Sequence, residues 1–313
     1  MDLVTGGAGF IGSHVTERLL SEGRDVRVLD DFSTGRRENF HFPLGPGAGR
    51  LEVVSGDIAD PGLARRAVEG VEHVFHQAAI PSVPRSVADP LASHHANATG
   101  TLNMLIAARD AGVKRFIYAS SSSVYGDSER LPKVETMPAA PLSPYAVSKL
   151  ACELYAKAFH RLYGLATIGL RYFNVFGPRQ DPASQYAAVV PKFITAIRDG
   201  RAPTIFGDGR QTRDFTYVGN AVDANMKARD CGPAAHGRSF NIACGASISL
   251  LELVDRINGI FGSRLAPVHE PSRPGDVKHS LADVSEAVGL LGYRPGVSLE
   301  EGLALTAAWY RKA

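Results

Sequence analysis

Short apolar runs alternate with longer amphipathic stretches through the first half of the chain. The short runs are too brief for helices and rich in β-branched residues. We expect strands at 3–5, 26–29, 51–55, 73–76, 115–119 and 166–171. Because alternating strands and helices build parallel sheets covered on both faces, the pattern predicts an α/β fold.

Beyond residue 172 this alternation loosens. Proline- and glycine-rich connections interrupt the chain at 176–179, 206–209 and 271–276. A strand at 240–243 and a helix after Ser249 indicate that two lobes exchange segments. We therefore predict a first domain over 1–172, with a returning segment near 213–245, and a smaller interleaved lobe over 173–313.

Composition narrows the class of protein. The 313 residues are 44% hydrophobic, and 34 basic residues balance 32 acidic ones, so no electrostatic footprint for nucleic acid is present. The three cysteines have no metal-ligand spacing, and their odd number argues against a disulfide framework. No leader and no membrane-spanning stretch is expected. We expect a cytoplasmic protein with no bound metal, no membrane and no nucleic-acid partner.

A glycine turn follows the first predicted strand. Gly6, Gly9 and Gly12 lie between that strand and a helix that begins near Ile11. Glycines in this context let a pyrophosphate approach the backbone, and the helix N-terminus meets its charge. Their spacing differs from the tighter G-x-G-x-x-G fingerprint, but the context still predicts dinucleotide binding.

An aspartate ends the second predicted strand. Asp30 lies where a carboxylate accepts hydrogen bonds from the adenosine ribose and repels a 2′-phosphate, which favours NAD over NADP. The alternatives are a solvated strand end, or a phosphate-tolerant loop carrying Arg36 and Arg37. After the third strand, Asp57 could reach the adenine amino group, or could cap the helix that starts at Pro61.

A tyrosine and a lysine four residues apart carry the candidate chemistry. A tyrosine is a base at neutral pH only if cations stabilise its phenolate, and Lys149 lies one helical turn from Tyr145 on the same face. The helix is expected to begin at Ser143 or Pro144. Ser121 would hydrogen-bond the reacting oxygen. The alternative is a core aromatic residue beside a solvated lysine.

The motifs of this chain resemble those of the extended short-chain dehydrogenase/reductase superfamily, and within it the nucleotide-sugar 4-epimerases. The motifs are TGGAGFIGSH, HQAAIPSVPRS, ASSSSVYGD, SPYAVSK, LRYFNVFGPRQDP, RDFTYV and RPGDVKHSLAD, in this order. The resemblance implies a Rossmann-type doubly wound domain with tightly held NAD, and a smaller α/β lobe gripping UDP. It also implies a homodimer formed through the helices at 97–111 and 144–163.

The same resemblance assigns cofactor contacts residue by residue. Asn97 and Tyr172 would line the nicotinamide. The full set of implied cofactor residues is Gly6, Gly9, Phe10, Ile11, Gly12, Asp30, Asp31, Ser33, Thr34, Gly35, Asp57, Ile58, Gln77, Ala78, Ala79, Asn97, Ala119, Tyr145, Lys149 and Tyr172.

Substrate contacts are implied in the same way. Arg213 and Arg273 would neutralise the diphosphate and Asp276 would hold the uridine ribose, as guanidinium forks and a carboxylate suit those groups. Salt bridges within loops are the alternative. The other implied residues are Pro81, Val83, Arg85, Ser121, Ser122, Ser123, Tyr145, Phe173, Asn174, the nucleotide wall Ala188, Val189 and Phe193, the uracil-reading backbone at Thr204 and Phe206, and Ser280.

Residue types at a few positions separate the reactions within this superfamily. Similar 4,6-dehydratases carry an Asp-Glu pair where Ser122 and Ser123 stand, and similar sugar-acid decarboxylases carry a glutamate at the second position. Without an added acid or base, the 4-keto sugar can only turn and take hydride back on its other face. The prediction is a UDP-sugar 4-epimerase.

Substrate choice follows from position 280 and from two further positions. A small Ser280 would admit an N-acetyl group, which favours UDP-N-acetylglucosamine with UDP-glucose also accepted. Some uronate epimerases carry threonine and arginine where this chain has Asn174 and Asp181, and this departure argues against UDP-glucuronic acid. It stays an alternative because Arg85 and nearby serines could still bind a carboxylate. A non-catalytic dinucleotide-binding regulator and a net alcohol dehydrogenase are the alternatives from other classes.

Overall fold

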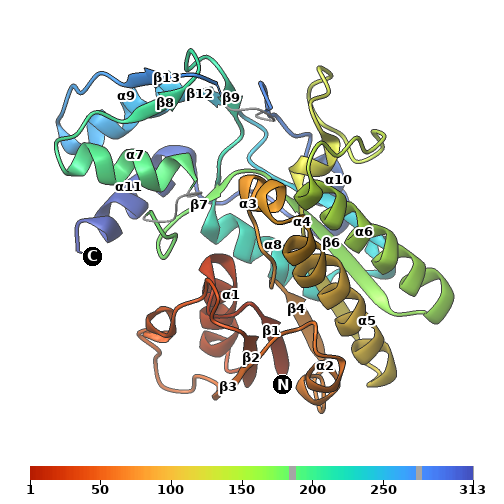
Figure 1. Ribbon diagram of the computed structural model, residues 1–313. Helices are drawn as coiled ribbons and strands as arrows, with labels where there is room; N and C mark the ends of the chain where they lie inside the picture. Colours follow the sequence, from red (N-terminus) through yellow and green to blue (C-terminus); the bar gives the residue numbers. More distant parts are fainter. Residues whose placement is uncertain (183–187, 273–276, 313) are drawn as a thin grey trace.

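Seven parallel strands form the central sheet of the protein (Figure 1). The computed structural model describes residues 1–182, 188–272 and 277–312. The strands lie in the order β11 (Arg238–Ile242), β6 (Ala166–Tyr172), β5 (Arg115–Ser121), β4 (His73–His76), β1 (Asp2–Thr5), β2 (Val26–Asp30) and β3 (Leu51–Ser55). All neighbouring pairs are parallel. The expected α/β class and all six strands predicted in the first half are confirmed.

Helices cover both faces of this sheet. One face packs against α1 (Phe10–Ser21), α8 (Val218–Asp230) and α10 (Ser285–Leu291). The other packs against α2 (Pro61–Ala67), α5 (Gly100–Asp110) and α6 (Pro144–Tyr163). Every residue of β1 is buried, as expected for an inner strand of a sheet covered on both faces.

A second core lies beyond the carboxyl ends of the strands (Figure 1). Its helices are α7 (Val189–Arg198), α9 (Leu250–Phe261) and α11 (Leu299–Tyr310). Three two-stranded sheets accompany them: β7 (Val175–Phe176) with β10 (Thr216–Tyr217), β8 (Thr204–Phe206) with β13 (Val268–Glu270), and β9 (Thr212–Arg213) with β12 (Ile248–Ser249). The helix expected after Ser249 is confirmed, and Ser249 and Glu252 form its capping box.

Two elements near the site differ from expectation. β5 and β6 run to Ser121 and Tyr172, because backbone pairing of Ser120 with Arg171 and of Ser121 with Tyr172 continues the ladder past the apolar run. The helix expected from residue 97 is instead a π-helical turn over His95–Thr99, followed by α5. The short helices α3 (Val83–Ala88) and α4 (Pro90–His94) precede this turn, and 3₁₀ turns occur at Arg37–Phe40, Ser122–Tyr125 and Pro233–Ala235.

The strand order reverses between β1 and β4. In sheets of this kind ligands bind in the crevice outside the carboxyl ends of the strands at that reversal. The residues that follow these strand ends are Gly6 after β1, Gln77 after β4 and Ser122 after β5. The topology therefore brings the glycine turn and the serine run to one edge of one sheet. No helix in the described part of the chain is long and apolar enough to cross a bilayer.

Candidate active site

The glycine turn joins β1 to α1 with backbone contacts that no side chain could share. A Cβ at Gly12 would lie 2.0 Å from the carbonyl oxygen of Gly6, and a Cβ at Gly6 would lie 2.7 Å from the backbone of Ala78. Gly6 has a φ of +67°, in the region that favours glycine. Gly9 caps α1 without a side chain, and the first turn of that helix carries no acidic residue. The turn thus fits the pyrophosphate of a dinucleotide.

Asp30 has a second role that the sequence did not reveal. Its carboxylate accepts hydrogen bonds from the backbone N–H groups of Ala8, at 2.9 Å, and Phe32, at 2.8 Å. Burial raises the pKa of Asp30, and these two bonds oppose the shift. The side chain therefore also holds the glycine turn to the loop after β2.

The two arginines of that loop contact other parts of the protein. Arg36 donates to Asp181 at 2.8 Å, and the Arg37 guanidinium lies 4.4 Å from the centre of the Phe32 ring. These contacts weaken the alternative of a loop that receives a 2′-phosphate. Asp31 accepts from the backbone N–H and the hydroxyl of Ser33.

Two aspartates, Asp57 and Asp60, follow the third strand, and they make different contacts. Asp57 accepts from the backbone N–H of Ala59 at 2.8 Å. The cap of α2 is Asp60, which accepts from Gly62 and Leu63, so the alternative that Asp57 caps this helix is wrong. The cap must lie within the residues that flank the first turn, and Asp60 immediately precedes Pro61.

Three reactive side chains meet where β5 ends and α6 begins. Ser143 caps α6 by accepting from Ala146 at 3.2 Å, which sets Tyr145 in the first turn. Lys149 donates to the carbonyl oxygen of Ala119 at 2.9 Å. Ser121 lies close enough to the Tyr145 phenol to lower its pKa by hydrogen bonding. The spacing expected from the sequence therefore corresponds to one cluster.

Burial shifts the pKa values of both titratable side chains in the cluster. It raises the pKa of Tyr145, against the hydrogen bond of Ser121, and it lowers the pKa of Lys149. Burial, with help from the Lys149 ammonium, also lowers the pKa of His76 to about 3, so this neighbouring imidazole stays neutral. Burial alone thus favours the neutral phenol and the neutral amine, so a phenolate at this site requires the positive charge of Lys149.

Asn97 lies in the π-helical turn and is fully buried. Its side-chain oxygen accepts from the backbone of Ile80 at 2.8 Å, and its nitrogen donates to Ser148 at 3.0 Å. It thus connects the loop after β4 to α6. π-Helical turns are frequent at functional sites.

A polar group on α8 was missed by sequence reasoning. Asn225 donates to the Tyr172 hydroxyl at 2.7 Å, and Gln77 donates to Asn225 at 3.0 Å. Asn225 has no exposed surface. The available signal was an asparagine at a buried position of an amphipathic helix.

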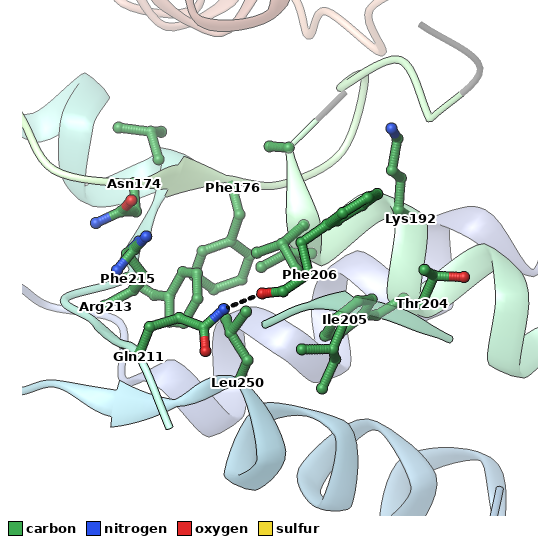
Figure 2. Close-up of a pocket in the computed structure, with 15 residues that line it drawn as sticks. Asn174, Phe176, Lys192, Thr204, Ile205, Phe206, Gln211, Arg213, Phe215 and Leu250 are labelled. Atoms are coloured by element: carbon green, nitrogen blue, oxygen red, sulfur yellow. Dashed lines mark hydrogen bonds between the residues drawn. The ribbon is translucent and has the colours of Figure 1, made fainter. Parts of the chain in front are cut away.

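A cavity of about 250 Å³ lies beyond the strand ends (Figure 2). It is lined by Asn174, Val175, Phe176, Ala188, Val189, Val190, Lys192, Phe193, Thr204, Ile205, Phe206, Gln211, Arg213, Phe215 and Leu250. All the residues expected for the nucleotide wall and for reading uracil are among them. Gln211 was not expected there; it donates to the carbonyl oxygen of Phe206 at 2.6 Å and so fixes the direction of that carbonyl (Figure 2).

The polar end of the cavity is organised around a buried carboxylate. Asn174, with a φ of +37°, donates to the backbone oxygen of Asp214 at 2.9 Å and lies 3.4 Å from the Ser280 hydroxyl. Burial raises the pKa of Asp214 to about 6, although three backbone N–H groups bond to it. Arg213 donates to the carbonyls of Thr212 and Lys278.

The other residues expected to contact the substrate lie on several different elements. Val83 and Arg85 belong to α3, next to α6, and Pro81 precedes them. Ser122 and Ser123 form the 3₁₀ turn after β5, and Ser123 donates to Ser121 at 2.9 Å. The Phe173 side chain packs in a buried cluster with Tyr125 and Ala243, so only its backbone could face a ligand. Arg273 and Asp276 lie outside the described residues.

Among the described residues, one group of potential metal ligands lies at the opposite end of the sheet. It consists of Asp2, Glu72 and His73. Arg24 donates to Asp2 and to Glu72 at 2.7–2.8 Å, so a guanidinium already neutralises these carboxylates.

Comparisons with known proteins agree with this geometry. Residues 3–243 match the model of the NAD dependent epimerase/dehydratase family. A UDP-glucose 4-epimerase of Mycolicibacterium smegmatis is 43% identical over 99% of this chain and 98% of its own. The UDP-N-acetylglucosamine 4-epimerase of Methanobrevibacter ruminantium M1, solved with UDP-N-acetylmuramic acid, superposes with a TM-score of 0.93 at 40% identity, covering 100% and 99% of the two chains. The UDP-glucose 4-epimerase of Thermus thermophilus, solved with NAD, superposes with a TM-score of 0.89 at 36% identity, covering 99% of each.

Proposed function

The chain belongs to the NAD dependent epimerase/dehydratase family, and from this we propose that it is a UDP-sugar 4-epimerase, an isomerase of nucleotide-sugar metabolism that uses bound NAD. The observation that carries the proposal is the cluster of Ser121, Tyr145 and Lys149 at the sheet edge that also carries the glycine turn. An intact cluster favours an enzyme over a dinucleotide-binding regulator.

The side chains divide the proton chemistry among them. The glycine turn would hold NAD, which when bound would supply the hydride acceptor and donor for C4. The Tyr145 phenolate accepts the proton of the 4-hydroxyl group as C4 is oxidised and gives it back when the ketone is reduced. Lys149 stabilises the phenolate, and Ser121 holds the reacting oxygen. Since hydride leaves one face of the sugar and returns to the other, C4 is inverted and no cofactor is consumed.

The residues after Ser121 limit the outcome to inversion. Ser122 and Ser123 carry hydroxyl groups, and the Ser123 hydroxyl donates to Ser121. Eliminating water from the ketone would need a stronger acid and base beside C5 and C6. We therefore assign neither dehydration nor decarboxylation to this site.

The sugar that fits is argued from the polar end of the cavity. Ser280 is small and contacts Asn174, which leaves room for an N-acetyl group. Asp181 pairs with Arg36, where an arginine would instead face a like charge. These two observations favour interconversion of UDP-N-acetylglucosamine with UDP-N-acetylgalactosamine and of UDP-glucose with UDP-galactose. UDP-glucuronic acid is the second candidate, because the partly buried Arg85 on α3 could bind a carboxylate.

Incubation with each sugar nucleotide tests this proposal. The protein as purified is given UDP-N-acetylglucosamine, UDP-glucose or UDP-glucuronic acid without added reductant, and products are resolved by chromatography and proton NMR. We expect the C4 epimers of the first two, with no net change in NADH absorbance. Epimerisation of the uronate alone would contradict the substrate assignment, and stoichiometric NADH would indicate a dehydrogenase. No epimer from any of the three would contradict the whole proposed substrate set.

We further propose that the protein is a homodimer. Exposed apolar side chains gather on two helices that touch each other, with Leu91 of α4 81% exposed and Leu154 and Leu162 of α6 61% and 70% exposed. Such a patch on a protein surface marks an interface. Resemblance to the superfamily places the dimer contact on α5 and α6.

Light scattering coupled to size-exclusion chromatography checks the dimer. Changing both Leu154 and Leu162 to lysine should convert a dimer to a monomer, because the lost apolar area and two buried charges then oppose association. Leu305→Lys, a leucine-to-lysine change on the exposed side of α11, is the control and should leave the dimer intact. A wild-type protein that elutes as a monomer would contradict the proposal.

A cytoplasmic location is also proposed. The three cysteines are free thiols, two of them buried, as is usual for proteins of reducing compartments.

A further inference from the structure

A buried carboxylate lies on α6 directly behind the reactive cluster. Glu153 is one helical turn beyond Lys149 and is almost inaccessible to solvent. Arg171 donates to it twice, from Nε at 2.8 Å and from Nη2 at 2.7 Å, and the Ser120 hydroxyl donates at 2.5 Å. The carboxylate charge is thus fully paired.

Each partner of Glu153 is the chain neighbour of a residue at the site. Ser120 precedes Ser121 on β5, and Arg171 precedes Tyr172 on β6. The two pairs face each other in the sheet register. A displacement of Glu153 would therefore be felt at both strand ends.

The network continues into the 3₁₀ turn after β5. Arg171 donates from Nη1 to the Tyr125 hydroxyl at 2.8 Å, and Tyr125 donates to Asn241 of β11 at 2.6 Å. Tyr125 has almost no exposed surface. The turn that carries Ser122 and Ser123 is thus connected to the same ion pair.

From these contacts we infer that Glu153, held by Arg171, is a positioning residue that sets α6 against β5 and so fixes the approach of Tyr145 to Ser121. The inference rests on the proposed epimerase function. Two side-chain hydrogen bonds join α6 to the end of β5. Lys149 donates to the Ala119 carbonyl, and Glu153 accepts from the Ser120 hydroxyl.

The arrangement matters for the reaction rate, because the rate depends on where the reacting groups lie. A well-packed apolar pair could replace a buried ion pair at little cost in stability, so stability alone does not explain the charges. Displacing a reacting group by about 1 Å can cost about 100-fold in rate. A bidentate guanidinium fixes direction as well as distance, which suits this role.

Ser120→Ala tests the inference with little risk to folding, since the ion pair of Glu153 and Arg171 remains. We expect kcat to fall about tenfold while KM stays within about twofold, because the cavity that holds the nucleotide is untouched. Glu153→Gln should lower kcat further. The matched control is Tyr118→Phe, which removes a hydroxyl bond to Ser239 from the same strand, two residues earlier.

A second measurement does not need turnover. Near-ultraviolet titration of the holoenzyme, corrected with a Tyr145→Phe background, reports the Tyr145 phenol directly. In Ser120→Ala it should titrate at higher pH than in the wild type, because the Lys149 ammonium is less well placed. Tyr118→Phe should titrate as the wild type does.

The outcomes separate the two claims. Wild-type kcat and wild-type titration in Ser120→Ala would overturn the inference, and so would equal losses in Ser120→Ala and Tyr118→Phe. A wild-type protein that epimerises no sugar nucleotide would contradict the proposed function, and the titration would still decide the positioning role.

Discussion

Tyr145→Phe is expected to lower kcat for C4 inversion by about 10³-fold while the protein stays folded. The substitution removes the only atom of the side chain that can exchange a proton with the 4-hydroxyl group, and it keeps the partly buried ring at the start of α6. Binding of the nucleotide in the cavity should be preserved, because Tyr145 is not among its lining residues. Single-turnover assays on the N-acetyl sugar measure the effect.

The pH profile of Lys149→Met extends this test. The rate grows with pH as Tyr145 loses its proton, and removing the ammonium favours the protonated phenol. The acidic limb of the kcat profile should therefore move to higher pH, by about 1 to 3 pH units. Lys157→Met, which changes an exposed lysine on the same helix, is the control and should leave the limb in place.

For the first variant, a residual rate in Tyr145→Phe close to that of the wild type would show that another group is the base.

Gly12→Ala is expected to abolish retention of NAD. The added Cβ would lie 2.0 Å from the Gly6 carbonyl oxygen and 2.9 Å from the Cα of Gly7, and a backbone turn cannot move aside as a flexible side chain can. Separating α1 from the turn displaces the N–H groups that meet the pyrophosphate, so affinity should fall at least about 100-fold. NAD released on denaturing the purified protein, quantified per chain, is the measurement.

Gly259→Ala provides the matched control for that change. Gly259 lies within α9, and a Cβ there meets no atom within 4 Å. The control should retain NAD and be slightly more stable, because alanine restricts the unfolded chain. Normal NAD content in Gly12→Ala would contradict the assignment of the glycine turn to the pyrophosphate.

Much of the sheet could be predicted because its signals are local. The runs at 51–55 and 73–76 begin and end where the strands do, since Gly56 follows the first directly and polar residues border the second. The start of α6 was also predictable from Ser143 and Pro144, a capping side chain followed by a residue suited to the first helical position.

Features that depend on distant partners could not be predicted. The bonds of Asp30 to Ala8 and Phe32 join two loops, and no local pattern reports them. Gln211 lines the cavity because it bonds to the end of β8, a contact between turns that the sequence does not encode locally. The π-helical turn at Asn97 looks like ordinary helix in a hydrophobic pattern, because one inserted residue changes the periodicity too little to be read.

The cavity and the reactive cluster have no residue in common. The cavity is lined by residues of β7, α7, β8, β9 and the start of α9 and by their connections, whereas Ser121, Tyr145 and Lys149 belong to β5 and α6. The residues proposed to bind the nucleotide of a substrate and those proposed to act on its reacting carbon therefore come from different segments of the chain. Exchanging the 188–215 segment between relatives would retarget the nucleotide without touching the proton path, and a lineage could diversify its substrates in this way while inheriting one chemistry.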